Sequence, residues 1–327
     1  MTFALLQHGG RVDAAARRYG GSRRDWLDLS TGINPRPWPV AKAGPVEWAN
    51  LPSPETLVEL EAAAAAHFGC APELCCAMPG SEAGMRLLAR LIALPGRAVP
   101  PTYRTHVDAF AESAPILFGE DPGAAATVMI ANPANPDGTL RDGSALLAWH
   151  DRIAARDGWL VVDEAFADAT PAQSVAGNVA ARANLVVLRS FGKFFGLAGL
   201  RLGFAIAPPL LIASLRRAMG DWPLHAAALR IASAAYRDQS WIAQARIDLA
   251  ARAVALDAML DRHGLIGMGA SPLFRLVVTP DAAALFERLA RARILVRPFA
   301  DNPNHLRFGV PADGLALARL DRALRDG

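Results

Sequence analysis

The chain has 327 residues, of which 52% are hydrophobic and 20% charged, and this composition excludes a disordered protein. The formal net charge is only +3, because 34 basic residues are scattered among 31 acidic ones, so we expect no nucleic-acid partner. No apolar run approaches the roughly 20 residues that cross a bilayer, and the N-terminus lacks a signal-peptide pattern, so we expect a cytoplasmic protein without a membrane partner.

The first part of the chain, residues 1–40, reads as an arm of mostly irregular structure with one short helix-like stretch at 12–19. Regular helical patterns begin after it. A Ser-Pro-Glu start predicts an Ala-rich helix over 54–69, because proline is favoured at the first helical position. A second helix is expected over 81–94.

Short apolar runs typical of strands then alternate with helical segments such as 144–156. This alternation indicates an α/β fold with a mostly parallel sheet, and we assign it to a large domain over residues 41–222. The expected strands are 98–100, 127–131, 159–162, 185–188 and 203–207.

The pattern changes after residue 222. A long helical region over 224–263 is followed by a shorter α+β set, which predicts a small C-terminal domain over 223–327 that the arm joins. The expected elements of this set are a strand at 274–279, a helix at 281–291, strands at 294–297 and 305–309, and a terminal helix.

Lysine is nearly absent from this arginine-rich chain, which contains only Lys42 and Lys193. An amine can lose its proton near neutral pH and form a covalent bond to a carbonyl carbon, whereas a guanidinium cannot. A lysine that remains among so many arginines is therefore a candidate for chemistry.

Polar residues follow several predicted strands, where ligands bind in open α/β sheets. Each signal alone is weak, because such residues are commonly helix caps or turns. Their occurrence together, in one order along one sheet, indicates a binding site. The segments are Gly80-Ser81-Glu82 at a helix start, Pro101-Thr102-Tyr103, Asn132–Gly138, Asp163-Glu164 and Ser190–Lys193.

The run 190–203 resembles the lysine segment of fold-type I pyridoxal 5′-phosphate (PLP) enzymes, the aspartate aminotransferase superfamily. The family pattern is Ser, two residues, the lysine that binds PLP, and Arg eight residues later, and Ser190, Lys193 and Arg201 match it. The Asn-Pro-x-Asn-Pro-x-Gly and Asp-Glu-Ala segments match in order and spacing. The resemblance implies a PLP-dependent transferase-like fold, with a mostly parallel seven-stranded sheet in the large domain and a smaller α+β domain.

The resemblance also implies the roles of individual residues. Lys193 would bind PLP covalently and move protons, Asp163 would pair with the protonated pyridine nitrogen, and Tyr103 would stack on the ring; these three are the predicted catalytic residues. No metal is expected. The other predicted cofactor contacts are Asn135 at the ring's phenolic oxygen, Gly80, Ser81, Ser190 and Arg201 at the phosphate, and Glu82 beside them.

Two positions depart from the family pattern. Phe166 stands where many members have a Tyr that donates to the phenolic oxygen, so one hydrogen bond to the cofactor is missing. Leu51 stands where many members have a Tyr that reaches into the site of the neighbouring subunit. The resemblance implies a homodimer, but the substrate contact from position 51 is in doubt.

Within the superfamily, His8-Gly9-Gly10 and the run 27–35 resemble the L-threonine-O-3-phosphate decarboxylase family of cobalamin biosynthesis. The resemblance implies a small phosphorylated amino-acid substrate, whose phosphate would lie near His8 and Gly9. The other substrate contacts that it implies are Gly32, Asn135, Arg297 and Arg307.

Three hypotheses stay open from the sequence. The first is PLP-dependent decarboxylation of L-threonine O-3-phosphate. The second is an aminotransferase that acts on a phosphorylated substrate such as histidinol phosphate, because Lys193 and Asp163 would serve both reactions. The third is a non-enzymatic binding module on the PLP fold, and the intact set of Lys193, Asp163 and Arg201 argues against it.

Overall fold

The computed structural model describes residues 8–325, which fall into two compact units. The predicted domain limits of 1–40, 41–222 and 223–327 stay a prediction. Residues 223–243 cluster with the larger unit, because the helix α9 (Ala226–Arg237) packs against α3 (Pro54–Phe68). The larger unit comprises Pro37–Asn135 and Thr139–Ala243, and the smaller one comprises the chain up to Arg36, Pro136–Gly138 and the chain from Gln244 onward.

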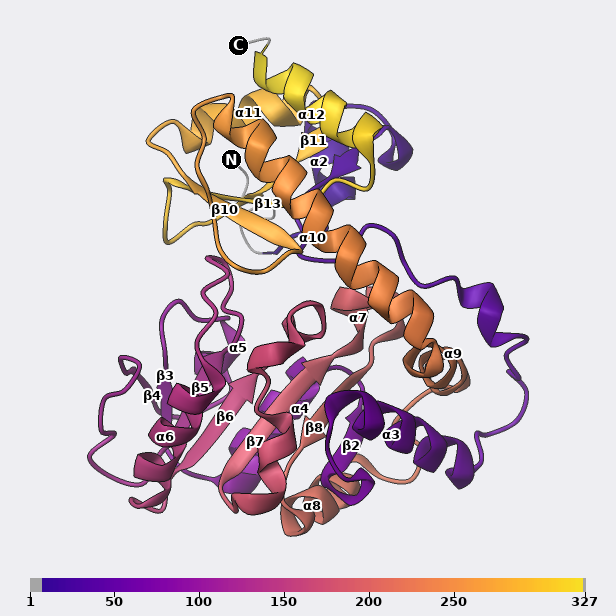
Figure 1. Ribbon diagram of the computed structural model, residues 1–327, viewed down its shortest axis with the longest axis vertical. Helices are drawn as coiled ribbons and strands as arrows, with labels where there is room; N and C mark the ends of the chain where they lie inside the picture. The colour runs from indigo at the N-terminus through magenta and orange to yellow at the C-terminus, as the bar shows by residue number, and fades with distance from the viewer. Residues whose placement is uncertain (1–7, 326–327) are drawn as a thin grey trace. The chain divides into compact units, whose positions relative to one another are not determined.

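The larger unit is built on a seven-stranded sheet in the order β2-β8-β7-β6-β5-β3-β4 (Figure 1). Strand β8 runs antiparallel to both of its neighbours, and the other adjoining pairs are parallel. The predicted fold class, α/β with a mostly parallel sheet, is confirmed. The strands are β2 (Cys75–Met78), β3 (Gly96–Ala98), β4 (Ser113–Pro115), β5 (Thr127–Ala131), β6 (Trp159–Asp163), β7 (Leu185–Ser190) and β8 (Gly203–Ile206).

The central strands contain long apolar runs that are buried because helices pack against the sheet. Leu160, Val161 and Val162 of β6 are fully buried, which explains why their run lacks the alternation of a half-exposed strand. The helices of this unit that contact the sheet include α3, α4 (Ser81–Ile92), α5 (Thr105–Asp108), α6 (Gly143–Ala154), α7 (Phe191–Phe194) and α8 (Pro209–Met219).

Parallel pairing brings the ends of three central strands to one edge. Asp163 at the end of β6 lies opposite Ala131 of β5 and opposite Leu188 of β7. The residues that follow β5, β6 and β7 therefore emerge side by side, as the sequence predicted for its polar segments.

The outer strands differ from the prediction. β3 was expected at 98–100 but ends at Ala98, because Pro100 and Pro101 have no N–H groups to continue a ladder. Strands β2 and β4 were not predicted, since both are short and β2 has no β-branched residue. Their pairing at the sides of the sheet depends on neighbours far along the chain.

The smaller unit contains a four-stranded antiparallel sheet in the order β12-β13-β10-β9, so its α+β character is confirmed. The predicted strand at 294–297 is divided between two sheets. Its first half, β11 (Ile294–Leu295), pairs with β1 (Leu27–Asp28) of the arm, and its second half, β12 (Arg297–Pro298), pairs with β13. The other elements are α2 (Val12–Tyr19), β9 (Gly267–Met268), β10 (Phe274–Val278), α11 (Ala282–Arg291), β13 (His305–Gly309) and α12 (Gly314–Arg325).

The predicted helical region over 224–263 is two helices, α9 and α10 (Gln239–Asp261), separated by Asp238. The Asp238 carboxylate caps α10, because its Oδ1 accepts a hydrogen bond from the Trp241 N–H at 3.2 Å. Its other oxygen, Oδ2, accepts from Lys42 Nζ at 2.8 Å and from the indole of Trp38 at 3.0 Å. One of the two lysines thus has a structural partner.

No helix within residues 8–325 has the length and apolar character needed to cross a membrane.

The Asp238 cluster gives a test of the larger unit's stability. We expect Asp238→Ala to lower the free energy of unfolding by about 1–2 kcal/mol, because the helix loses its cap. Hydrogen bonding to Lys42 holds the pKa of Asp238 below its usual value, so this stabilisation is present above about pH 4 and fades as the pH falls further. Urea denaturation at pH 7 and at pH 3 measures both effects.

Lys42→Met is the matched control. The ammonium is half-exposed, so its loss should cost no more than about 1 kcal/mol. Equal losses for the two variants, or a loss at Asp238 that persists unchanged at pH 3, would contradict the assignment of Asp238 as a helix cap.

Candidate active site

One pocket lies at the strand-end edge of the larger unit, and every residue predicted to contact the cofactor lines it. The pocket is formed by the starts of α4 and α7 (Phe191–Phe194), the ends of β6 and β7, and the loop after β5. The predicted residues that line it are Gly80, Ser81, Glu82, Tyr103, Asn135, Asp163, Ser190, Lys193 and Arg201.

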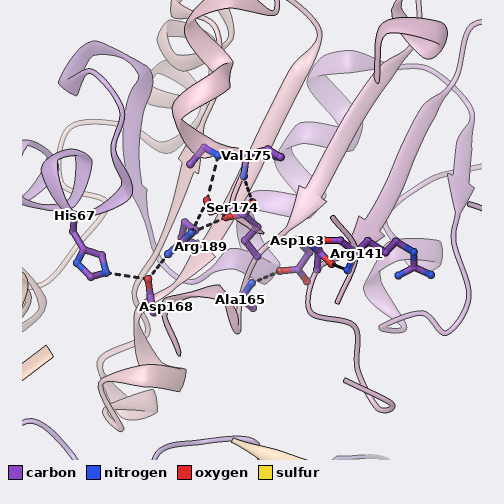
Figure 2. A network of polar contacts seen from close by, with 11 residues as sticks. His67, Arg141, Asp163, Ala165, Asp168, Ser174, Val175 and Arg189 are labelled. Atoms are coloured by element: carbon purple, nitrogen blue, oxygen red, sulfur yellow. Dashed lines mark hydrogen bonds and ion pairs between the residues drawn. The ribbon is translucent and has the colours of Figure 1, made fainter. Parts of the chain in front are cut away.

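Asp163 is a buried carboxylate, with 6% of its surface exposed, at the end of β6. Its Oδ1 accepts a hydrogen bond from the Ala165 N–H at 3.1 Å, as Figure 2 shows. Its Oδ2 lies 3.1 Å from Nε2 of His106, which is fully buried on α5. Both oxygens therefore have a partner, and the carboxylate is fixed in position at the wall of the pocket.

His106 is a residue that the sequence analysis missed. It stands three residues after Tyr103, and nothing in the local pattern distinguishes it from an ordinary core histidine. Its contact with Asp163 joins α5 to β6 across 57 positions of sequence. No local signal could have found it, because its contact with Asp163 depends on how α5 packs beside β6.

The start of α4 forms an anion cradle from backbone. The first N–H groups of a helix have no intrahelical partner and attract negative charge. Gly203 on β8 packs so closely there that an added Cβ would collide with the backbone nitrogen of Ser81. The guanidinium of Arg201 lies over Gly80, where a Cβ would be 3.2 Å from Arg201 Nη2.

Arg201 itself has a strained backbone, with a φ of 50° in the left-handed region that side chains rarely adopt. Its Nη1 donates to the carbonyl of Ala198 at 3.2 Å. The strained turn and this hydrogen bond together direct a permanent positive charge at the cradle.

Lys193 is carried by the short helix α7, which follows β7 directly. Its Nζ lies 5.6 Å from the centre of the Phe166 ring. Phe166 thus occupies the wall beside the amine, where it provides an aromatic face and no hydroxyl. Gly192 allows α7 to pack on the next turn, because a Cβ there would be 2.6 Å from the Cα of Ala198.

Tyr103 is held by Glu82, which the sequence grouped with the cofactor contacts. The Tyr103 hydroxyl donates to Glu82 Oε2 at 3.1 Å, and Thr105 donates to Oε1 at 3.2 Å. Burial would raise the pKa of Glu82, but hydrogen bonds from Tyr103, Arg86 and Thr105 outweigh it and hold the pKa below its usual value. The carboxylate therefore stays charged and fixes the tyrosine ring at the pocket wall.

The two asparagines of the Asn-Pro-Ala-Asn-Pro segment have different positions. Asn132 is structural, because its side chain accepts from the Arg141 N–H at 2.7 Å and donates to the Arg141 carbonyl at 3.1 Å. Asn135 lines the pocket with Pro133. The hydrogen bonds of Asn132 to Arg141 thus anchor the start of the segment, and Asn135 is the asparagine that lines the pocket.

The predicted substrate arginines lie in the smaller unit, directly opposite each other. Arg297 on β12 pairs in register with Arg307 on β13, so both side chains are on one face of the sheet. Arg307 is buried and donates from Nη2 to the carbonyl of Ser30 at 2.8 Å. Burial, together with the positive charge of Arg297, lowers the pKa of Arg307. The structure therefore brings two positively charged side chains together on neighbouring strands.

The beginning of the arm contacts the same residue, Ser30. The Gly10 N–H donates to Ser30 Oγ at 2.7 Å, and a Cβ on Gly9 would collide with the Ser30 carbonyl. Gly32 is buried two residues further on, whereas His8 is exposed. The structure therefore brings Gly9 and Arg307 together at Ser30, within the smaller unit.

Among residues 8–325, no group of three His, Cys, Asp or Glu side chains is arranged to hold a metal ion.

Comparison with known proteins identifies relatives over nearly the full chain. Residues 116–325 match the family described as aminotransferase class I and II. The chain is 42% identical to a threonine-phosphate decarboxylase from Pseudomonas aeruginosa, over 98% of this chain and 97% of that protein. It is 41% identical to a threonine-phosphate decarboxylase from Sinorhizobium sp., over 98% of each. Its fold is similar to that of histidinol-phosphate aminotransferase from Sinorhizobium meliloti in complex with pyridoxal-5′-phosphate, with a TM-score of 0.83, 20% identity and coverage of 96% and 94% of the two chains.

The packing around the start of α4 predicts that alanine substitution lowers stability at Gly203 but not at Gly199. Gly203→Ala should destabilise the protein by about 2–3 kcal/mol or more, because the methyl group meets backbone that cannot move aside. Gly199→Ala should be nearly neutral, since nothing lies within 4 Å of the added carbon. Thermal unfolding and PLP titration by absorbance measure both variants. Normal stability and PLP affinity for Gly203→Ala would contradict the packing described for this cradle.

Proposed function

Because the chain belongs to the aminotransferase class I and II family, we propose that it is a threonine-phosphate decarboxylase, a PLP-dependent carboxy-lyase. It converts L-threonine O-3-phosphate to (R)-1-amino-2-propanol O-phosphate and CO₂, a step of cobalamin biosynthesis. The observation that carries this proposal is the similarity to two threonine-phosphate decarboxylases, which runs through the arm, the larger unit and the smaller unit alike.

The cofactor is PLP, and the pocket of the larger unit fits it. A backbone cradle with Arg201 beside it suits a phosphate, and a buried carboxylate suits a protonated ring nitrogen. Lys193 provides the amine for a covalent link in the same pocket. The phosphate would be held by Ser81, Ser190 and Arg201, a ring face would be covered by Tyr103, and the phenolic oxygen would be contacted by Asn135.

When bound, PLP would supply an electron sink for the α-carbon of the substrate, and it would weaken whichever bond of that carbon stands perpendicular to the ring. Asp163 supports this role by keeping the ring nitrogen protonated, and His106 holds Asp163 in place at 3.1 Å. Lys193 is the group that delivers a proton to the α-carbon once CO₂ has left. The phenylalanine at 166 leaves the phenolic oxygen without a tyrosine donor.

The selection of decarboxylation rests on where the substrate's anions are held. Threonine phosphate carries a phosphate that stays and a carboxylate that leaves, so the protein must orient both. Arg297 and Arg307 are assigned to these anions because they form a like-charged pair that an anion would stabilise. The substrate's phosphate is assigned to His8, Gly9 and Gly32. The reason is that Gly9 and Arg307 both contact the Ser30 carbonyl.

The protein is further proposed to be a cytoplasmic homodimer. Supporting this assembly are exposed apolar side chains of the larger unit: Trp48 and Leu51 are 73% and 69% exposed, and Val58 and Trp222, which line one groove, are also exposed. Leu51 would place an apolar group, without a hydroxyl, toward the neighbouring subunit. Light scattering of the active enzyme should give the mass of a dimer, and a fully active monomer would contradict it.

The decisive experiment for the proposed function is a CO₂ assay without an amino acceptor. Purified protein, PLP and threonine phosphate should release CO₂ in the absence of any 2-oxo acid. A parallel reaction contains histidinol phosphate and 2-oxoglutarate, with glutamate as the readout. Glutamate formation in place of CO₂ release would identify an aminotransferase for a phosphorylated substrate, and no turnover of either substrate would favour a non-enzymatic module.

Lys193 should be the residue that carries the cofactor. Borohydride reduction followed by peptide mapping should find the pyridoxyl group on Lys193, because that amine faces the pocket. Lys42 is a built-in control, since it is engaged by Asp238 at 2.8 Å outside the pocket. A label on Lys42, or on neither lysine, would contradict the assigned site.

Arg307→Ala should raise KM for threonine phosphate by about 100-fold or more, because a charge-assisted contact to the anion is lost, while the spectrum of bound PLP stays unchanged. Arg275→Ala is the matched control. Arg275 is also a buried arginine, but it lies on the opposite face of the same sheet and binds Asp257 at 2.7 Å and 2.9 Å. Similar KM values for both variants would remove Arg307 from the substrate site.

A further inference from the structure

A buried ionic network lies next to the pocket in the larger unit and has no part in the function derived above. Its centre is Arg189, which is 2% exposed (Figure 2). Two carboxylates, Glu164 and Asp168, bind this guanidinium and are each 1% exposed. Figure 2 shows that His67, Asp168 and Arg189, which come from three separate segments of the unit, point toward one another.

Each of the two terminal nitrogens of the Arg189 guanidinium donates a hydrogen bond to a carboxylate. Arg189 Nη1 donates to Glu164 Oε2 at 2.6 Å, and Nη2 donates to Asp168 Oδ1. Asp168 Oδ1 also lies 3.1 Å from Nε2 of His67 on α3. The Arg189 guanidinium further lies over the ring of Phe68, 4.6 Å from its centre.

Glu164 extends the network to a neighbouring loop. Its Oε1 accepts from the Val175 N–H at 2.7 Å, and its Oε2 accepts from the Ser174 hydroxyl at 2.6 Å. Arg189 Nη1 also donates to Ser174 Oγ at 3.2 Å. The side chain of Arg189 therefore binds the segment after β6 at its first residue, Glu164, and again ten residues further on, at Ser174.

The position of the network in the chain connects it to the pocket. Glu164 directly follows Asp163 in the sequence. Arg189 directly precedes Ser190, and Ser190 lies three residues before Lys193. The two strands are parallel neighbours, and the Glu164 N–H donates to the Leu188 carbonyl at 2.9 Å. The Arg189–Glu164 pair thus bridges the ends of β6 and β7 on the two residues next to the pocket.

Ionic pairs in a protein interior stabilise a fold little, because desolvation of the charges offsets their attraction, and apolar residues of the same volume frequently serve as well. Their directional hydrogen bonds do specify one arrangement of the groups they join. A network that joins the residues beside Asp163 and Lys193 is placed to set the separation of these two groups.

We propose that Arg189 is a positioning residue, which acts through its bonds to Glu164 and Asp168 to fix the ends of β6 and β7 and so the placement of the Asp163 carboxylate relative to the Lys193 amine. This inference rests on the PLP site of the proposed function. It predicts that the network controls the protonation of bound PLP and the chemical step, and has little effect on substrate affinity.

The test compares Arg189→Lys with a matched control, Arg216→Lys. Arg216 also binds a buried carboxylate in the larger unit, Glu61 at 2.7 Å, but neither residue lines the pocket or adjoins Asp163 or Lys193 in the chain. Lysine keeps the charge in both variants and removes the second donor arm, because an ammonium cannot bridge two carboxylates as a guanidinium does.

Three quantities are measured on the PLP-loaded proteins: the melting temperature, the pH midpoint of the absorbance change of bound PLP, and kcat and KM for threonine phosphate. For Arg189→Lys we expect a midpoint shift of about half a pH unit or more and a fall in kcat of about tenfold, with KM within about threefold. Arg216→Lys should lower the melting temperature while its midpoint and kcat stay at wild-type values.

Ser174→Ala covers the case in which Arg189→Lys does not fold. It removes only the hydroxyl between Glu164 and Arg189, and it should shift the midpoint and kcat in the same direction by a smaller amount. The proposal is overturned if the folded Arg189 or Ser174 variant keeps wild-type midpoint and kcat, or if the Arg216 control changes them equally. Wild-type protein that binds no PLP would instead overturn the proposed function, and this inference with it.

Discussion

The parallel register of β5, β6 and β7 is the constraint on which the remainder of the site depends. Because Ala131, Asp163 and Leu188 lie opposite one another, the three following segments leave the sheet at the same edge. Each segment then needs only a local turn to present its polar side chain. The pocket therefore gathers an amide, a carboxylate and an amine from positions that are roughly 30 residues apart along the chain, with backbone pairing as the frame.

The buried charged side chains of the larger unit discussed above each have a hydrogen-bond or ion-pair partner. Asp163 has His106 and a backbone N–H, and Arg189 has two carboxylates. Glu61 follows the same principle, since it accepts from the Ala77 N–H at 2.9 Å and binds Arg216. Such pairs cost desolvation, but an unpaired buried charge would cost several kcal/mol, so the pairs hold their elements in one arrangement.

The two units present N–H groups and positive charge by different physical means. In the larger unit the start of α4 offers backbone N–H groups, and close packing by Gly203 and one arginine complete the cradle. In the smaller unit the means are side chains, Arg297 and Arg307, placed opposite each other on neighbouring strands. The proposed cofactor contacts thus depend on backbone and one arginine in the larger unit, and the proposed substrate contacts depend on two side chains of the smaller unit.

The sequence by itself determined the fold class and the main polar residues of the pocket, through local patterns and through the family resemblance that those patterns carry. Apolar runs alternating with helical segments predict a parallel sheet, and the spacing of Ser190, Lys193 and Arg201 is contained in one short segment. Only the tertiary structure decided which distant groups meet: His106 with Asp163, Arg189 with Glu164 and Asp168, and β11 with β1 of the arm. Such contacts join positions up to 267 residues apart, as in the pairing of Leu27 with Ile294. They arise from strand register and helix packing, which no local periodicity specifies.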